Sequence, residues 1–314
     1  MNTFTLPTKN SNLEFTGERF VPGVTGEMEL EHIHRYLFAV NACKDKRVLD
    51  IASGEGFGSF ILAQCAKTVT GVDIDQEAVK NANDIYGSSN LEFLKGSCQK
   101  IPLADATVDV VVSFETLEHI VEHDDFLKEI KRVLCPNGVL IMSTPDTDIY
   151  SNGQPTENPY HLKELTLAEY ESLIKTYFKN THMFGQKCFS GCAIQNIDHL
   201  FSQNHSKRSN IYFNPDAEKV KKDHNLERIP YIVTVASDNQ IEDNLLNNNF
   251  FVSTTSVNDL LAMRKQIEEE KKQIEEIKKI ATDSLNLILN SWTWKITAPL
   301  RSVKKFLLKI RKGT

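Results

Sequence analysis

Short apolar stretches alternate with stretches of helical hydrophobic spacing from residue 47 to residue 143. The apolar stretches predict five strands, at Arg47–Ile51, Thr68–Val72, Leu91–Leu94, Val108–Phe114 and Gly138–Ser143. The stretches between them predict helices at Phe57–Ala66, Gln76–Tyr86 and Phe126–Val133. Because this alternation gives parallel strands joined by crossover helices, the sequence predicts an α/β layered sheet.

Further segments complete a predicted domain over residues 31–240. They are an irregular segment at 1–30, helices at 31–44 and 166–178, and strands at Thr181–Gln186 and Tyr231–Ala236. Thr166, with Glu169 three residues later, gives the second helix a capping-box pattern. Residues 188–229 have weak periodicity and predict no element.

The first strand runs into a glycine loop, Gly54-Glu55-Gly56-Phe57-Gly58, and then into a helix. In open α/β sheets ligands bind at the carboxyl ends of the strands, and glycines let the backbone approach them closely. Two ligand classes compete for such a loop. Dinucleotides use G-x-G-x-x-G, whereas this loop reads G-x-G-x-G and has Ser59 at the third glycine position.

Acidic residues at the ends of the first two strands distinguish these classes. A carboxylate at Asp50 would repel a pyrophosphate and attract the ammonium and sulfonium groups of S-adenosylmethionine. Asp73 closes the next strand, near the ~20-residue spacing at which an acid reaches a ribose hydroxyl. Charge complementarity therefore predicts S-adenosylmethionine as the cofactor.

Five motifs in order over residues 47–145 resemble those of class I S-adenosylmethionine-dependent methyltransferases. They are VLDIASGEG (48–56), GVDID (71–75), GSCQKIP (96–102), DVVVSFETLEH (109–119) and RVLCPNGVL (132–140). The resemblance implies a Rossmann-like seven-stranded sheet with helices on both faces and a final antiparallel strand, for which Tyr231–Ala236 is the candidate. Ser97 and Asn137 depart from the family's usual Asp and Gly.

The resemblance also implies which residues would bind S-adenosylmethionine. Its methionine part would lie against Asp50, Ala52, Ser53, Gly54 and Gly56. Asp73 would bind the ribose hydroxyls, and the adenine would lie among Ile74, Ser97 and Cys98. Phe114 would lie below the cofactor, and Arg19 and Tyr36 are expected contacts.

Methyl transfer to a hydroxyl needs a base within hydrogen-bond reach. The catalytic candidates are Glu115 and His119 after the fourth strand and His161 in a turn-rich insert. A histidine can accept a proton near neutral pH. The alternatives are that His119 organises its loop and that His161 is a surface turn residue.

The same region predicts no metal site. The spacing of His119, His123 and Asp124 matches no strong ligand pattern. Glu118 is a further catalytic candidate at the same strand edge, and the alternative is that it caps or pairs locally.

Segments outside the core motifs bear on the methyl acceptor. Thr16–Gly23, Glu31–Tyr36 and Asn158–Thr166 resemble methyltransferases found among bacterial surface-polysaccharide and O-antigen biosynthesis proteins. We expect residues 1–30 to fold over the cofactor as a lid. The expected acceptor is a small molecule or a glycan.

Residues 259–290 have a different pattern. Leu260, Ile267, Ile274, Ala281 and Ile288 recur every seventh residue among Glu, Lys and Gln. This spacing predicts a coiled coil and a homo-oligomer, although Glu270 and Ser284 interrupt the second apolar position. The alternative is a single solvated helix packed on its own domain.

Residues 291–314 are predicted to form a basic tail that ends in an amphipathic helix. Leu300, Val303, Leu307 and Ile310 share one face, cations fill the remainder, and both tryptophans of the chain precede it. This composition suits a helix lying in a membrane surface, and the alternative is docking on another subunit or a partner. The run WKITAPLR resembles C-terminal segments of bacterial glycosyltransferases and related glycan-assembly proteins.

Composition limits the remaining options. A net charge of −6 argues against a nucleic-acid partner. The six cysteines form no C-x-x-C pair, and Met1–Phe15 lacks an apolar signal core. We therefore expect a cytoplasmic protein, peripheral at the inner face of the cell membrane.

Three functions remain in view. The first is O-methylation of a sugar or glycan intermediate at the membrane face. The second is methylation of another small metabolite, such as a quinone or a carrier-bound acid. The third is a membrane-tethered scaffold whose cofactor pocket is vestigial.

Truncation after Asn290 tests the tail. The truncated protein should no longer sediment with anionic vesicles, because several cations that each contribute ~1 kcal/mol are removed. Its affinity for S-adenosylmethionine should be unchanged. Sedimentation equal to that of the full chain would show that the tail is not the anchor.

Overall fold

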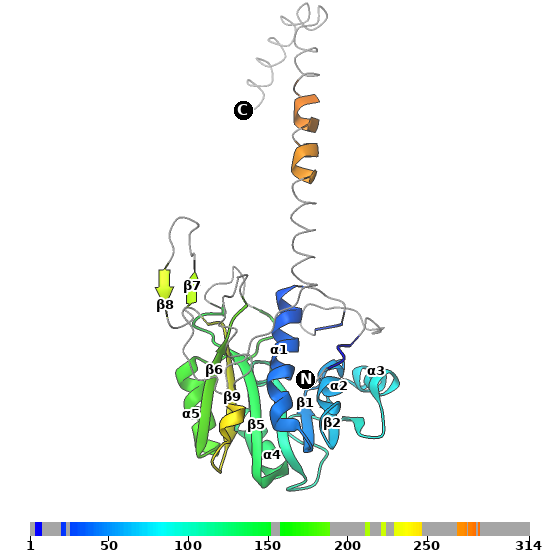
Figure 1. The fold of residues 1–314 in the computed structure, drawn as a ribbon, viewed down its shortest axis with the longest axis vertical. Coiled ribbons are helices and arrows are strands. Elements are labelled where there is room, and N and C mark those ends of the chain that lie inside the picture. The colour runs from blue at the N-terminus through cyan, green and yellow to red at the C-terminus, as the bar shows by residue number, and fades with distance from the viewer. Residues whose placement is uncertain are drawn as a thin grey trace, which may run out of the picture. The chain divides into compact units, whose positions relative to one another are not determined.

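The computed structural model describes residues 4–7, 20–22, 26–151, 158–188, 211–213, 221–223, 229–246, 269–274, 276–280 and 282. The chain divides into two compact units, residues 1–253 and residues 254–314. Seven strands of the first unit form one sheet in the order β3-β2-β1-β4-β5-β9-β6 (Figure 1). The predicted seven-stranded α/β sheet is therefore confirmed.

The strands of this sheet are β1 (Arg47–Ile51), β2 (Thr68–Asp73), β3 (Leu91–Lys95), β4 (Val108–Phe114), β5 (Leu134–Pro145), β6 (Asn180–Gln186) and β9 (Tyr231–Ser237). β1 pairs in parallel with β2 and β4, β2 with β3, and β4 with β5. β9 lies antiparallel between β5 and β6, as predicted for Tyr231–Ala236. β7 (Ile211–Phe213) and β8 (Lys221–Asp223) form a separate antiparallel pair within the stretch that the sequence left unassigned.

Helices cover both faces of the sheet, as predicted. α1 (Glu27–Cys43), α2 (Phe57–Ala63) and α3 (Gln76–Tyr86) bury side chains with Val48, Val69 and Val110 in one core cluster. α4 (His123–Val133) and α5 (Leu167–Tyr177) bury side chains with Leu49, Val111 and Leu140 in the other. Neighbouring strand residues thus alternate between the two cores, because successive side chains of a strand point to opposite faces.

Helix starts follow local capping chemistry. The Asp75 carboxylate accepts hydrogen bonds from two backbone N–H groups at the start of α3. Thr166 and Glu169 form the predicted capping box at the start of α5. Two short 3₁₀ helices, η1 (Leu117–His119) and η4 (Asp243–Leu245), follow β4 and β9.

Several predicted boundaries were wrong. α1 begins at Glu27, so the last residues of the segment predicted as irregular over 1–30 are helical; Glu27 and Glu29 favour this start because acidic side chains complement the helix dipole. α4 begins three residues early for the same reason, with Asp124 and Asp125 in its first turn. α2 ends at Ala63. β5 is longer than predicted because it pairs with β4 and β9 over most of its length.

The second unit is helical where it is described. Residues 269–274, 276–280 and 282 are helical, and Ile274, Ile277 and Ile280 are exposed. The rest of the predicted coiled coil at 259–290 and the whole tail at 291–314 lie outside the described residues, so both stay predictions. None of the helices in the described parts of the chain is long and apolar enough to cross a membrane.

Gly58 tests how α1 packs on α2. A Cβ at this position would lie 1.9 Å from the ring of Tyr36. Helix propensity alone makes Gly58→Ala stabilising by up to about 1 kcal/mol. We expect instead a loss of about 1–3 kcal/mol in the free energy of unfolding, because the ring must move. Urea unfolding would measure it, with exposed Lys80→Ala as control; a stabilised Gly58→Ala variant would contradict this packing.

Candidate active site

The glycine loop after β1 curls through left-handed backbone. Ala52, Gly54 and Gly56 have φ values of 62°, 54° and 83°. A Cβ at Gly56 would lie 2.7 Å from the ring of Phe93, so only glycine fits there without a shift. Non-glycine residues rarely hold positive φ, and such positions cluster at ligand sites. The loop thus makes a tight turn at the carboxyl edge of the sheet, with no room for a side chain at Gly56.

Asp50 lies completely buried beneath this loop. Its carboxylate accepts a 2.6 Å hydrogen bond from the Ser59 hydroxyl, and the Tyr36 hydroxyl shares its one proton between the two carboxylate oxygens, each 3.3 Å away. Burial raises the pKa of Asp50 to about 7, against the lowering effect of these two hydroxyls. The carboxylate therefore joins β1 to α1 and α2, and direct contact with the cofactor stays a prediction.

Asp73, at the end of β2, holds the loop from its other side. Its carboxylate accepts hydrogen bonds from the backbone N–H of Gly54, at 2.8 Å, and of Asp75, at 2.9 Å. Each oxygen of a carboxylate can accept more than one hydrogen bond. Asp73 can therefore hold the loop and still accept from ribose hydroxyls, which stays a prediction.

Three observations show that the loop fits a nucleoside-bearing cation. The Ser53 hydroxyl is buried and has no hydrogen-bond partner among the described residues, so it offers a polar group to a ligand. Ile74 is 70% exposed directly after Asp73, which leaves an apolar surface beside the candidate ribose site. Asp50 supplies a buried carboxylate under the same loop.

The other predicted cofactor residues have different positions. Ser97 and Cys98 lie half-buried after β3, and burial raises the pKa of the Cys98 thiol to about 12, with a contribution from Asp73. Phe114 is buried at the end of β4 and packs edge-to-face on Tyr36, with ring centroids 5.0 Å apart. Arg19 lies outside the described residues, as does most of the predicted lid.

A second polar group lies where β4 and β5 end, beside the strand that carries the loop. Glu115 has a φ of 49°, directly after β4, and its carboxylate accepts a 2.6 Å hydrogen bond from Ser143 of β5. Arg35 of α1 lies 3.5 Å from the other Glu115 oxygen. A strained residue at the carboxyl edge of a central strand is typical of a functional position.

The structure brings Glu118, His119 and His161 together. One ligand atom from each lies within 4.8 Å of those of the other two. The rings of His119 and His161 meet edge to face, with centroids 5.0 Å apart. Glu118 is 1% exposed and accepts a 3.1 Å hydrogen bond from Thr144, and burial beside Glu115 raises its pKa well above the ordinary value. Glu118 thus lies beside the two candidate histidines, and its hydrogen bond from Thr144 joins it to β5.

Hydrogen bonds orient both histidine rings. Nδ1 of His119 lies 3.0 Å from the carbonyl oxygen of Tyr160, and Nδ1 of His161 lies 2.5 Å from a carboxylate oxygen of Glu164. Burial raises the pKa of Glu164, but hydrogen bonds from Ser151 and His161 hold it below the ordinary value overall. Glu164 is therefore a carboxylate at neutral pH, and His161 donates to it from Nδ1.

Arg35 is one of two site residues that the sequence predictions missed. It is 1% exposed, donates from Nε to Gln186 at 2.7 Å, and lies 4.5 Å over the ring of Tyr231. Its Nη1 has no hydrogen-bond partner within the described part of the chain. The signal was an arginine on the buried face of a predicted helix, since arginines are almost never fully buried without a partner. Glu164 was also missed, although it follows His161 by three residues.

His123 and Asp124 do not join the cluster. The His123 ring is buried, and its Nε2 lies 3.0 Å from the carbonyl oxygen of Leu117. Asp124 accepts a hydrogen bond from the Tyr177 hydroxyl at 2.5 Å. His123 and Asp124 thus hydrogen-bond to neighbouring parts of the fold and do not contribute to the cluster.

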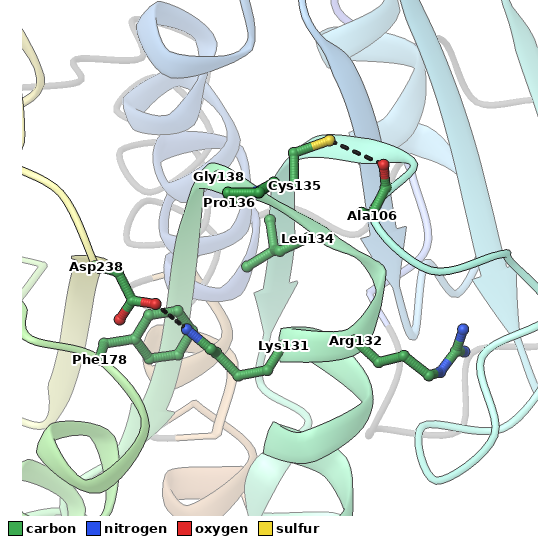
Figure 2. Close-up of a pocket in the computed structure, with 9 residues that line it drawn as sticks. All are labelled: Ala106, Lys131, Arg132, Leu134, Cys135, Pro136, Gly138, Phe178 and Asp238. Carbon is green, nitrogen blue, oxygen red and sulfur yellow. Dashed lines mark hydrogen bonds and ion pairs between the residues drawn. The ribbon is translucent and has the colours of Figure 1, made fainter.

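A pocket of about 330 Å³ lies at the opposite edge of the sheet (Figure 2). The residues around it come from the loop before β4, the end of α4, the start of β5 and the segments that follow α5 and β9, and an ion pair between Lys131 and Asp238 crosses it. They are Ala106, Lys131, Arg132, Leu134, Cys135, Pro136, Gly138, Phe178 and Asp238. Since ligands of open α/β sheets bind at the carboxyl edge, this pocket is not the candidate active site.

Known proteins match this part of the chain. Residues 49–142 match the family described as a methyltransferase domain. A probable S-adenosylmethionine-dependent methyltransferase of Mycolicibacterium smegmatis is 36% identical over 169 residues, 53% of this chain and 65% of that protein. One of Mycobacterium tuberculosis is 35% identical over 190 residues, 59% of this chain and 68% of that protein.

Among solved structures, a methyltransferase of Thermotoga maritima covers 67% of this chain and 90% of its own, with 15% identity and a TM-score of 0.47. The chain spans about two thirds of the length of the two mycobacterial relatives. At 35% identity over that share, it belongs to the S-adenosylmethionine-dependent methyltransferases. S-adenosylmethionine is accordingly its cofactor, and binding of that cofactor by the loop between Asp50 and Gly58 stays a prediction.

The buried carboxylate predicts how cofactor affinity depends on pH. Because burial raises the pKa of Asp50 to about 7, its charge is lost as pH falls through 7. The ionised form attracts the cationic ligand, so the Kd for S-adenosylmethionine should rise by up to about tenfold per pH unit below 7. Calorimetry between pH 6 and 8.5 would measure this.

Asp50→Asn is the matched control, since it keeps the shape and removes the charge. Titration of the ligand itself affects both proteins equally, so the variant should show only that residual dependence. Asp50→Ala should abolish binding, because it also leaves the Tyr36 and Ser59 hydroxyls without their acceptor. Identical pH profiles in wild type and Asp50→Asn would refute the role of the charge.

Proposed function

We propose that this protein transfers the methyl group of S-adenosylmethionine to a hydroxyl group. The observation that carries this proposal is the convergence of Glu118, His119 and His161 at the carboxyl edge of the sheet. The strand before them, β4, pairs with β1, which leads into the cofactor loop. A hydroxyl nucleophile needs such a group beside the donor site, because it reacts poorly while it keeps its proton.

When bound, S-adenosylmethionine supplies a methyl group on a positively charged sulfur. The cluster of Glu118, His119 and His161 activates the acceptor hydroxyl, which loses its proton as its oxygen bonds to the methyl carbon. The carbon–sulfur bond breaks and its electron pair stays on sulfur. Asp50 and Asp73 hold the loop that positions the donor, and correct alignment of the two reactants contributes a large share of such rates.

The proposed acceptor is a hydroxyl of a sugar or glycan intermediate at the cytoplasmic face of the membrane. Two features support it: the resemblance of residues 158–166 and of the tail to glycan-assembly proteins, and the basic amphipathic pattern of 291–314. More distant relatives favour a second acceptor class. A fatty-acid O-methyltransferase of Mycolicibacterium smegmatis and a ubiquinone biosynthesis O-methyltransferase of Schizosaccharomyces pombe are 33% and 31% identical.

Labelled S-adenosylmethionine distinguishes these acceptors. Pooled nucleotide sugars, lipid-linked glycans, fatty acids and quinones would be offered separately, and label should transfer to the glycan pools. Transfer only to fatty acids or quinones would replace the glycan proposal. Absence of both cofactor binding and transfer would favour a tethered scaffold.

The histidine pair predicts the effect of His161→Ala. Loss of one member of the cluster should lower kcat by about 10²–10⁴ and leave the Kd for S-adenosylmethionine within twofold, because His161 acts on the acceptor. His182→Ala is the control, since His182 lies exposed on β6. Equal activity of the two variants would exclude His161 from catalysis.

A further inference from the structure

We propose that Glu118, His119 and His161 bind a divalent transition-metal ion. The three residues come from two segments, the 3₁₀ turn after β4 and the insert after β5. Each offers one ligand atom, and these atoms lie within 4.8 Å of one another. Two imidazoles and one carboxylate form a known ligand set for catalytic zinc and for other first-row metals.

His119 has the ring orientation that a metal ligand needs. A carbonyl oxygen only accepts hydrogen bonds, so Nδ1 of His119, 3.0 Å from the Tyr160 carbonyl, carries the proton. Nε2 therefore has the lone pair, and it faces the Glu118 carboxylate at 4.0 Å. Metal-binding histidines almost always donate their other ring N–H to a carbonyl or a carboxylate.

His161 has the same arrangement with the second kind of partner. Its Nδ1 lies 2.5 Å from Glu164, so this nitrogen donates and Nε2 is left with the lone pair. Glu164 in turn accepts from Ser151, and Tyr150 stacks on the imidazole with ring centroids 5.8 Å apart. The ring is thus fixed on both sides before any ligand binds.

The surroundings of Glu118 favour a bound cation. Its carboxyl group is buried, and among the described residues no lysine or arginine forms an ion pair with it. Its hydroxyl partner, Thr144, carries no charge. Buried carboxylates in proteins are paired or coordinate metals.

The ligand set also selects the ion. Imidazole suits zinc and its first-row neighbours, whereas magnesium and calcium prefer all-oxygen sites. Three protein ligands leave at least one coordination position open, as in catalytic zinc sites. Only the role of the ion rests on the proposed function. At the open position the ion would bind the acceptor oxygen and lower the pKa of that hydroxyl, whose proton would pass to water before methyl transfer.

Zinc binding by the full-length protein tests the site without any substrate. Equilibrium dialysis with Zn²⁺ should give one tightly bound ion per chain. His119→Ala and His161→Ala should each weaken binding at least 100-fold, and Glu164→Gln should weaken it 10–100-fold, because that change removes only the partner of a ligand. His182→Ala should bind like wild type. Far-ultraviolet circular dichroism and the Kd for S-adenosylmethionine would check that each variant is folded.

Co²⁺ distinguishes this site from a cysteine site, since the cysteines of the described residues, Cys43, Cys65, Cys98, Cys135 and Cys188, are free thiols. Co²⁺ bound by nitrogen and oxygen should give visible absorption without a thiolate charge-transfer band. A thiolate band, or undiminished Zn²⁺ binding by the His119→Ala/His161→Ala double variant, would overturn the proposal, as would a wild-type chain that binds no ion. If only the proposed function is wrong, the protein should still bind one zinc ion per chain but transfer no methyl group.

Discussion

A buried carboxylate organises the end of β1, the glycine loop and the two helices beside them. Asp50 lies beneath the glycine loop, and a charge without solvent must be neutralised or hydrogen-bonded. Tyr36 of α1 and Ser59 of α2 both donate to it, so two helices are joined to the end of β1. The same Tyr36 ring fills the space that any side chain at Gly58 would need. One polar constraint thus fixes the strand end, the loop and the packing of both helices.

The candidate cofactor site and the cluster of Glu118, His119 and His161 lie at the same edge of the sheet. The loops after β1 and β2 form the candidate cofactor site, and those after β4 and β5 bring Glu118, His119 and His161 together. Both halves contain non-glycine residues with positive φ, Ala52 and Glu115. Ala52 and Glu115 follow two paired parallel strands, so both lie at the carboxyl edge of the sheet, where the strands hold them in place. The arrangement suits a donor and an acceptor that must meet in a fixed orientation.

Most of the sheet could be predicted because its signals are local. Apolar strands such as Val108–Phe114 are buried on both faces, and the capping box at Thr166 and Glu169 marks a helix start within four residues. The predicted boundaries that were wrong depend on interactions that hydrophobic periodicity does not reveal. α1 begins earlier through favourable charges in its first turn, and β5 extends because partners on both sides satisfy its backbone.

The sequence by itself determined the cofactor class, since the strand, the glycines and the acids at Asp50 and Asp73 follow one another along a short stretch of chain. It also identified His119 and His161 separately as candidates. Only the tertiary structure decided that they share one site with Glu118, that Asp50 is wholly enclosed, and that Arg35 is buried beside Glu115. The physical reason is distance: hydrogen bonds and desolvation act over a few ångströms in space, and the chain brings those residues together only when β5, its insert and α1 pack on the sheet.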